Sequence, residues 1–450
     1  MRLLFSLCII LLVLCISVLS DHHGHGDGQN KKGQHGKEHG KKDEHKDGHK
    51  HERHHGHHGH HGHHRDRHHH HEKHENGSLR LYKENGEFAF SLYKQIASKS
   101  DSQSKNIFFS PLSVSLALAA LSLGTRGKTH QQLFSGLGFN ETEITVEEVN
   151  EAFHQILLDL SKKADVDLSV GSALFMHNTF KPQPEFLENM KRYYHSEGFT
   201  ADFTKTTDTT DLINKYVKDK THGKISKLVK DLDPSTVMYL ISYMYFKGKW
   251  EIPFDPEKTQ GSIFHVNKTH KVPVQMMAKS DSFFVYHDKE ISAHVLQLRY
   301  NGSVSMMLIL PEHGLEAFEK VFSRAHMKKW YRHVKETHCE VYIPKFSIET
   351  SYDLKDILTG MGITDIFSAG ADFTGISDSP LVVSKVVQKA TLDVDESGST
   401  ATAATGVEVM LMSVRFPLIL RFDRPFMMII GHHETRSLLF MGKIVNPTGK

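Results

Sequence analysis

Cysteine is scarce in this chain of 450 residues. It has three, and two of them, Cys8 and Cys15, lie within the first twenty residues. If those twenty residues are removed, only Cys339 remains, and an internal disulfide is excluded. The mature chain must then be stabilised by core packing. We expect Cys339 to be a buried, unreactive thiol, with pairing to an outside partner as the alternative.

The chain also lacks an excess of charge, with 55 Lys and Arg against 53 Asp and Glu. This balance argues against a nucleic-acid binder, which is usually strongly basic. Long apolar runs are confined to residues 1–20, where Arg2 precedes an apolar stretch from Leu3 to Leu19. Val18 and Ser20 suit a cleavage site, so we predict a signal peptide and a secreted, extracellular protein without a membrane anchor. A transmembrane anchor is the alternative.

Residues 21–75 contain no Leu, Ile, Val, Phe, Tyr, Trp or Met. Because such a segment has no apolar surface to bury, it is predicted to be a disordered extension. It holds 21 of the 36 histidines, and its 11 Lys and Arg nearly balance its 10 Asp and Glu. Its net charge therefore depends on its histidines, which titrate near pH 6.5.

Neutral imidazole is a ligand for zinc, copper and nickel, so we predict that the extension binds these metals. When protonated at low pH, the same segment would attract a polyanion. A solvated spacer whose metal binding is incidental is the alternative. The predicted ligands are the histidines of the densest part: His51, His54, His55, His57, His58, His60, His61, His63, His64, His68, His69, His70, His71 and His74.

Four sites fit the N-x-[ST] pattern and agree with a secretory route. They predict a glycoprotein modified at some of Asn76, Asn140, Asn267 and Asn301.

The body of the chain, residues 76–450, has no repeat and no interior linker, and we predict one α+β domain. The periodicity predicts helices at Glu84–Ser98, Leu112–Leu123 and Thr145–Leu160. Strands are expected at Leu168–Phe175, Val237–Phe246, Val295–Leu310, Glu340–Phe346, 381–394, Pro425–Ile430 and Leu438–Val445.

Enzyme motifs are missing from this body. It has no GxGxxG before a helix, no P-loop, no HExxH and no GxSxG, and its fifteen histidines show no metal-ligand spacing. We therefore predict a protein that is not an enzyme and requires no cofactor.

Residues 396–413 read ESGSTATAATGVEVMLMS and include a run of seven small side chains, Ser399 to Thr405. Further motifs are NIFFSPLSVSLALAALSLGTRGKT (106–129), YHSEGFTADF (194–203), FKGKW (246–250), YDLKDILTGMGITDIFSAGADFTGI (352–376), RPFMMII and FMGKIVNP (440–447). With these motifs, residues 80–450 resemble the serpin family and its secreted, antitrypsin-like branch. The resemblance implies a monomer of about nine helices and three β-sheets with an exposed reactive loop. It also implies a suicide-substrate inhibitor of serine proteases.

The resemblance places the hinge of this loop at Glu396, Gly398, Ser399, Thr400, Ala401, Thr402, Ala403, Ala404 and Thr405. The reactive bond lies sixteen residues beyond the hinge glutamate in the family, which gives Met412-Ser413 here. Methionine suits a chymotrypsin-like or elastase-like protease. Arg415, which would select a trypsin-like protease, is the runner-up, and neighbours such as Leu411 also stay open.

Two residues depart from the family pattern at the point where the sheet that receives the loop opens. Ser242 stands where asparagine is usual and Gln388 where histidine is usual, beside serines that match Ser110 and Ser113. An altered opening keeps other functions possible. One is a non-inhibitory serpin that carries a small hydrophobic ligand, such as a hormone or biliverdin. Another is a metal- or haem-binding plasma protein.

Overall fold

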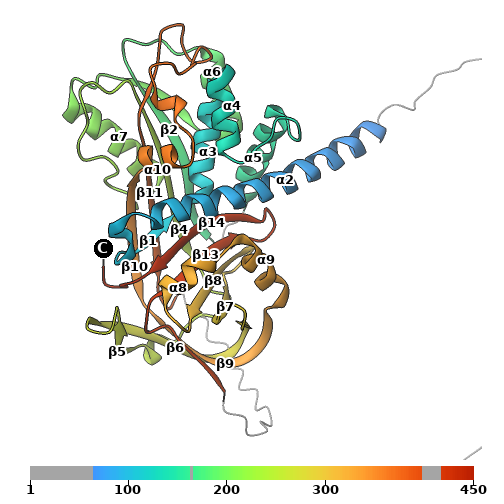
Figure 1. The fold of residues 1–450 in the computed structure, drawn as a ribbon, viewed down its shortest axis with the longest axis vertical. Helices are drawn as coiled ribbons and strands as arrows, with labels where there is room; N and C mark the ends of the chain where they lie inside the picture. The colour runs from blue at the N-terminus through green and yellow to red at the C-terminus, as the bar shows by residue number, and fades with distance from the viewer. Residues whose placement is uncertain (1–63, 163–165, 398–416, 450) are drawn as a thin grey trace, which may run out of the picture. The chain divides into compact units, whose positions relative to one another are not determined.

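The computed structural model describes residues 64–162, 166–397 and 417–449 of the chain (Figure 1). In this part, nine α-helices accompany fourteen strands in two hydrogen-bonded sheets. The helices are α2 (His64–Ala97), α3 (Pro111–Ser122), α4 (Gly127–Gly136), α5 (Val146–Ser161), α6 (Pro184–Tyr194), α7 (Thr206–Lys220), α8 (Leu315–Val321), α9 (Arg324–His333) and α10 (Lys355–Gly360). None of these helices is both long and apolar enough to cross a bilayer.

The smaller sheet has five strands, which include the two central strands of the site described below. In order across the sheet they are β10 (Phe346–Asp353), β11 (Val383–Val394), β4 (Met238–Gly248), β2 (Val166–His177) and β3 (Glu197–Ala201). The neighbours β11 and β4 run parallel, whereas β10 with β11 and β2 with β4 are antiparallel.

The larger sheet has nine strands. The path runs through β1 (Ile107–Phe109), β14 (Ser437–Ile444), β13 (Phe426–His432), β8 (Val304–Pro311), β7 (Ala293–Arg299), β6 (Lys271–Asp288), β9 (Lys335–Pro344) and β12 (Leu418–Arg421), with β5 (Gln260–His265) paired to β6. The first part of the long strand β6 pairs with β5 and its last residues pair with β7. The family resemblance predicted three sheets. In the structure β6 pairs with strands of two of these, so that they form one continuous nine-stranded sheet beside the five-stranded one.

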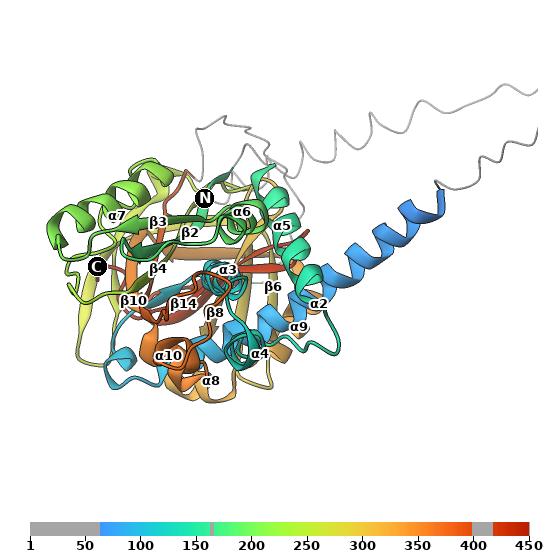
Figure 2. The same cartoon turned by 90° about the horizontal axis from the view of Figure 1, so that it is seen from above.

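Helix α3 forms the middle of the molecule (Figure 2). All twelve of its residues are buried, and it contacts β14 of one sheet and β2 and β4 of the other. The helix begins at Pro111, a residue favoured at the first helical position, and Ser110 caps it by accepting a hydrogen bond from the backbone of Ser113. A helix that is apolar on all sides is suited to lie between two sheets.

Both faces of the central strands are buried. Leu240 and Met244 of β4 belong to the main core beneath α3. Because side chains alternate along a strand, Ile241 and Tyr243 point to the other face, where they join a smaller core with Ile213 of α7. The larger core therefore lies on the α3 side of the sheet, and the smaller core lies on the α7 side.

The predicted helices at 112–123 and 145–160 are confirmed as α3 and α5, and α5 carries a capping box between Thr145 and Glu148. The single strand predicted at Val295–Leu310 is wrong. The structure has a hairpin of β7 and β8, because Asn301 and Gly302 reverse the chain and Gly302 adopts a φ of 92°. The strand predicted at Glu340–Phe346 also divides, between β9 and β10.

Helix α2 begins at His64, so it includes residues 64–75 of the predicted extension. Extending an existing helix costs less free energy than starting one, and this segment contains no proline. Apolar burial is therefore not needed for these residues to be helical. The buried cysteine is confirmed: Cys339 is 0% exposed, and burial raises the pKa of its thiol to about 11.

Candidate functional site

Four polar residues lie where β4 and β11 meet beneath the start of α3. Ser110 caps α3 and Ser113 lies in its first turn, while Ser242 belongs to β4 and Gln388 to β11. All four are 0% exposed. Ser242 and Gln388 lie directly opposite each other across the parallel strand pair. We call these four residues the Ser113 cluster.

Ser113 connects the two strands within this cluster. Its Oγ lies 2.9 Å from the Oγ of Ser242, and it accepts a hydrogen bond of 3.2 Å from Nε2 of Gln388. The same Nε2 also donates to the backbone oxygen of Ser110, at 2.9 Å. Ser242 and Gln388 are thus joined through Ser113, a residue on a third element. The Oε1 atom of Gln388 has no hydrogen-bond partner in the described part of the chain.

We predict that Ser113→Ala lowers the free energy of unfolding by about 1–3 kcal/mol, because it leaves the buried hydroxyl of Ser242 without its partner. Gln388 would keep its bond to Ser110. Denaturant-induced unfolding measures the effect. The control Ser135→Ala removes an exposed hydroxyl that donates to the backbone of Gln132, and should change stability by less than about 0.5 kcal/mol. Equal effects of the two substitutions would contradict this interpretation of the cluster.

A second group of contacts holds the chain immediately after β11. Trp250 Nε1 donates a hydrogen bond to the backbone oxygen of Asp395 at 2.8 Å. The backbone N–H of Phe254 donates to the backbone oxygen of Glu396 at 3.1 Å. The Glu396 carboxylate accepts a hydrogen bond from Thr259 at 2.8 Å and pairs with Lys345 at 2.7 Å. We call the contacts of Glu396 the Glu396 anchor.

Glu396 is 8% exposed, and its ionisation reflects these contacts. Burial acts to raise the pKa of Glu396, but the hydrogen bonds from Lys345 and Thr259 outweigh it and hold the pKa below its ordinary value of 4.5. A lowered pKa in the folded state means that the ionised anchor stabilises the fold above the ordinary pKa. This stabilisation is lost as the pH falls through the lowered value.

Of the predicted hinge and reactive-bond residues, only Glu396 lies in the described part. The others lie outside it: Gly398, Ser399, Thr400, Ala401, Thr402, Ala403, Ala404, Thr405, Met412, Ser413 and Arg415. Among the predicted metal ligands, those from His51 to His63 also lie outside. The remaining six, from His64 to His74, belong to the first turns of α2.

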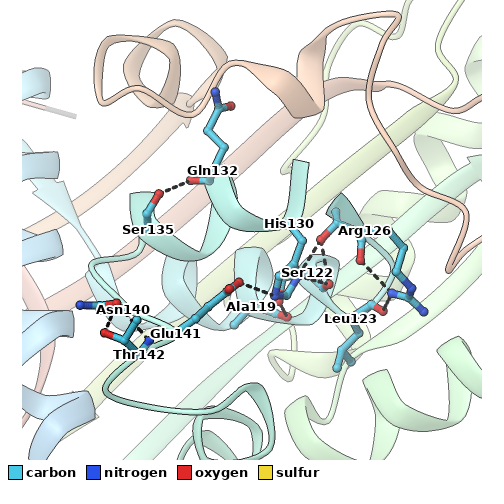
Figure 3. Close-up of polar contacts among 11 residues, drawn as sticks. Ala119, Ser122, Leu123, Arg126, His130, Gln132, Ser135, Asn140, Glu141 and Thr142 are labelled. Carbon is cyan, nitrogen blue, oxygen red and sulfur yellow. Dashed lines mark hydrogen bonds and ion pairs between the residues drawn. The ribbon is translucent and has the colours of Figure 1, made fainter. Parts of the chain in front are cut away.

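Three predicted glycosylation sites have described side chains. Asn140 and Asn267 are exposed, and in each the side-chain oxygen accepts hydrogen bonds from the backbone and hydroxyl of the threonine two residues on. Figure 3 shows this arrangement at Asn140, in the loop between α4 and α5. Asn301 is half-buried in the turn between β7 and β8, while Asn76 lies within α2.

A cavity of about 620 Å³ lies between α2, α9 and the hairpin of β13 and β14. Its walls include Tyr82, Met327 and Tyr331, together with the guanidinium of the buried Arg324. Arg324 donates to Glu87 at 3.1 Å, but its Nε and Nη2 atoms have no hydrogen-bond partner in the described residues. The wall also carries the cationic side chains of Lys83, Lys328 and Arg436, so the cavity can hold a small anionic molecule with an apolar or aromatic part.

The histidines of the body show no metal-ligand spacing along the chain, but folding brings two of them close to a glutamate. The structure brings His287 of β6 and His294 of β7 together with Glu312, which follows β8. Spacing along the chain could not indicate this group, because strand pairing brings its members together.

Comparison with known proteins agrees with this architecture. The family model described as "Serpin (serine protease inhibitor)" matches residues 83–447. Alpha-1-antichymotrypsin of Pongo abelii is 42% identical over 376 residues, covering 82% of this chain and 88% of its own. An alpha-1-antitrypsin-like protein of Tamias sibiricus is 40% identical over 374 residues, covering 82% and 90%. A crystal structure of human thyroxine-binding globulin complexed with thyroxine matches with a TM-score of 0.78 and 36% identity, covering 83% of this chain and all of that one.

Proposed function

The chain belongs to the serpin family, and on this premise we propose that it is a secreted inhibitor that acts as a suicide substrate of chymotrypsin- or elastase-like serine proteases. The protease serine would attack the carbonyl carbon of Met412, and the bond to Ser413 would break as its amine takes up a proton. The acyl-enzyme would then be trapped when the cleaved loop inserts between β4 and β11. Release of stored strain would drive this insertion.

The observation that carries the proposal is the arrangement around β11. This strand lies parallel to β4 and runs directly into the hinge glutamate, and the segment that follows has neither charge nor proline from Gly398 to Thr405. Small uncharged side chains can be buried in a sheet at low cost, whereas a charge or a proline opposes burial. The Ser113 cluster connects the two strands that would have to separate.

We predict that the protease cleaves Met412-Ser413. Methionine is unbranched and apolar, so it fits the primary specificity pocket of an elastase- or chymotrypsin-type enzyme. After incubation with elastase or chymotrypsin, N-terminal sequencing of the released C-terminal peptide should begin at Ser413. A peptide that begins at Phe416 would instead assign the reactive bond to Arg415 and a trypsin-like target.

A second candidate function is transport of a small hydrophobic ligand, and the cavity around Arg324 favours it. The similar structure of thyroxine-binding globulin is complexed with thyroxine. Titration with thyroxine and with biliverdin tests this function. Trp330 lies in α9, the helix that supplies Met327 and Tyr331 to the cavity wall, so its emission should respond. If neither compound changes the emission or binds at equilibrium, these two ligands are excluded.

We also propose that the histidine-rich extension binds divalent transition metals. Binding requires deprotonated imidazole, so metal affinity should fall as the pH falls through about 6.5. Over the same range the extension gains positive charge, so attraction to heparin should rise. Calorimetric titration with zinc or nickel, at pH 7.5 and 5.5, checks this on the full chain and on a variant that starts at Asn76. High-capacity binding that persists in the shortened chain, or at pH 5.5, would contradict it.

A further inference from the structure

His287, His294 and Glu312 lie at one corner of the nine-stranded sheet, outside the site described above. His287 is the penultimate residue of β6 and lies directly opposite His294 of β7. Glu312 follows β8, and its backbone N–H donates to the oxygen of Ser292 at 2.9 Å. Because Ser292 is two residues before His294, Glu312 is a diagonal neighbour of His294, within reach of a long side chain.

The three side chains converge on one point. Nε2 of His287 lies 2.9 Å and Nε2 of His294 lies 3.2 Å from the same Glu312 oxygen. The two imidazole rings are stacked, with centroids 4.3 Å apart and planes inclined by 12°. All three ligand atoms lie within 4.8 Å of one another. Ligand atoms on one tetrahedral zinc ion are about 3.3 Å apart, so small side-chain rotations suffice to bind an ion.

The backbone around these residues is held firmly. Next to His287, the buried carboxylate of Asp288 accepts hydrogen bonds from Trp330 Nε1 at 2.8 Å and from Lys329 at 2.9 Å. These contacts fix the end of β6 against α9. A rigid backbone lowers the entropy that ligands lose when they bind a metal.

The charges and the donor set suit a borderline-soft cation. Two imidazole nitrogens and one carboxylate oxygen are ligand types that zinc binds in proteins. Glu312 supplies one negative charge, while Arg424 nearby opposes a cation. Nδ1 of His294 has no hydrogen-bond partner among the described residues, and a missing partner of this kind lowers metal affinity by roughly 10- to 100-fold.

We propose that His287, His294 and Glu312 form a zinc-binding site on the folded body, separate from the histidine-rich extension. Two imidazoles and one carboxylate leave a fourth tetrahedral position for water. The ion would cross-link β6, β7 and the end of β8, and so stabilise this corner of the sheet.

Thermal unfolding of the full-length protein, with and without zinc chloride, tests the site. A ligand that binds only the folded state raises the unfolding midpoint, and at about one hundred times the dissociation constant we expect a rise of about 3 °C. His287→Ala and Glu312→Gln should each abolish this rise. Every variant keeps the extension, so zinc binding by that segment cancels from the comparison.

His313→Ala is the matched control, because His313 is an exposed histidine next to Glu312 that lies outside the group. It should keep the full rise. Without zinc, the midpoints of both site variants should stay near that of the parent protein, since His287 and Glu312 are exposed. The proposal is overturned if zinc at concentrations up to about 1 mM gives no rise in the unfolding midpoint of the parent protein. It is equally overturned if both site variants retain the rise.

Discussion

Ser399→Arg is expected to convert the protein from an inhibitor into a substrate and to raise the stoichiometry of inhibition at least tenfold. In the serpin family, side chains of the inserted strand alternate between the two faces of the sheet, and position 399 faces inward by that alternation. The interior beneath β4 and β11 is dry: Ser242, Met244 and Gln388 are 0% exposed there. Burying a guanidinium costs several kcal/mol, while about 1.4 kcal/mol already slows insertion tenfold.

Slow insertion gives the acyl-enzyme time to hydrolyse and to release active protease. The matched control is Thr400→Arg, whose side chain by the same alternation faces the other side of the sheet, where the core is smaller, and should have a smaller effect. Titration of a fixed amount of protease with each variant measures the stoichiometry. If both variants inhibit as well as the parent protein, the hinge does not insert in the way proposed here.

The second large effect is expected from Glu396→Lys, which lowers stability because it places a second ammonium group opposite that of Lys345. The substitution breaks the 2.7 Å ion pair with Lys345 and the 2.8 Å hydrogen bond from Thr259. Because Lys345 remains partly exposed, we expect a loss of about 2 kcal/mol rather than the larger cost of a fully buried pair. The chain after β11 would be released, so the reactive loop should also be cleaved more readily without complex formation.

The charge-swapped variant Glu396→Lys with Lys345→Glu tests whether the pair causes this effect. It restores opposite charges at the same two positions and should recover much of the lost unfolding free energy, measured in denaturant. A double variant no more stable than Glu396→Lys alone would show that the ion pair does not hold the hinge.

Much of the fold could be predicted from the sequence, because α3, α5 and the central strands carry clear hydrophobic periodicity. The Ser113 cluster could be predicted only in part. The two departures from the family pattern, Ser242 and Gln388, indicated an altered contact across the sheet. That Ser113 joins them depends on how deeply α3 packs between the sheets, which no local pattern encodes.

The group of His287, His294 and Glu312 could not be predicted, for a related reason. Six residues lie between the two histidines and seventeen lie between His294 and Glu312, which matches no helical or loop ligand motif. Their proximity depends on the register of β6 with β7, and on the turn after β7 that the sequence-based prediction missed. Strand pairing of this kind is a long-range property.

Formation of a covalent complex tests the proposed inhibitory function most directly. The full-length protein should be incubated with chymotrypsin and with elastase, and the products separated on a denaturing gel. The proposal predicts a one-to-one band that survives denaturation, accompanied by a released peptide that begins at Ser413. Cleavage at Met412 without any stable complex, at every ratio of protein to protease, would contradict it.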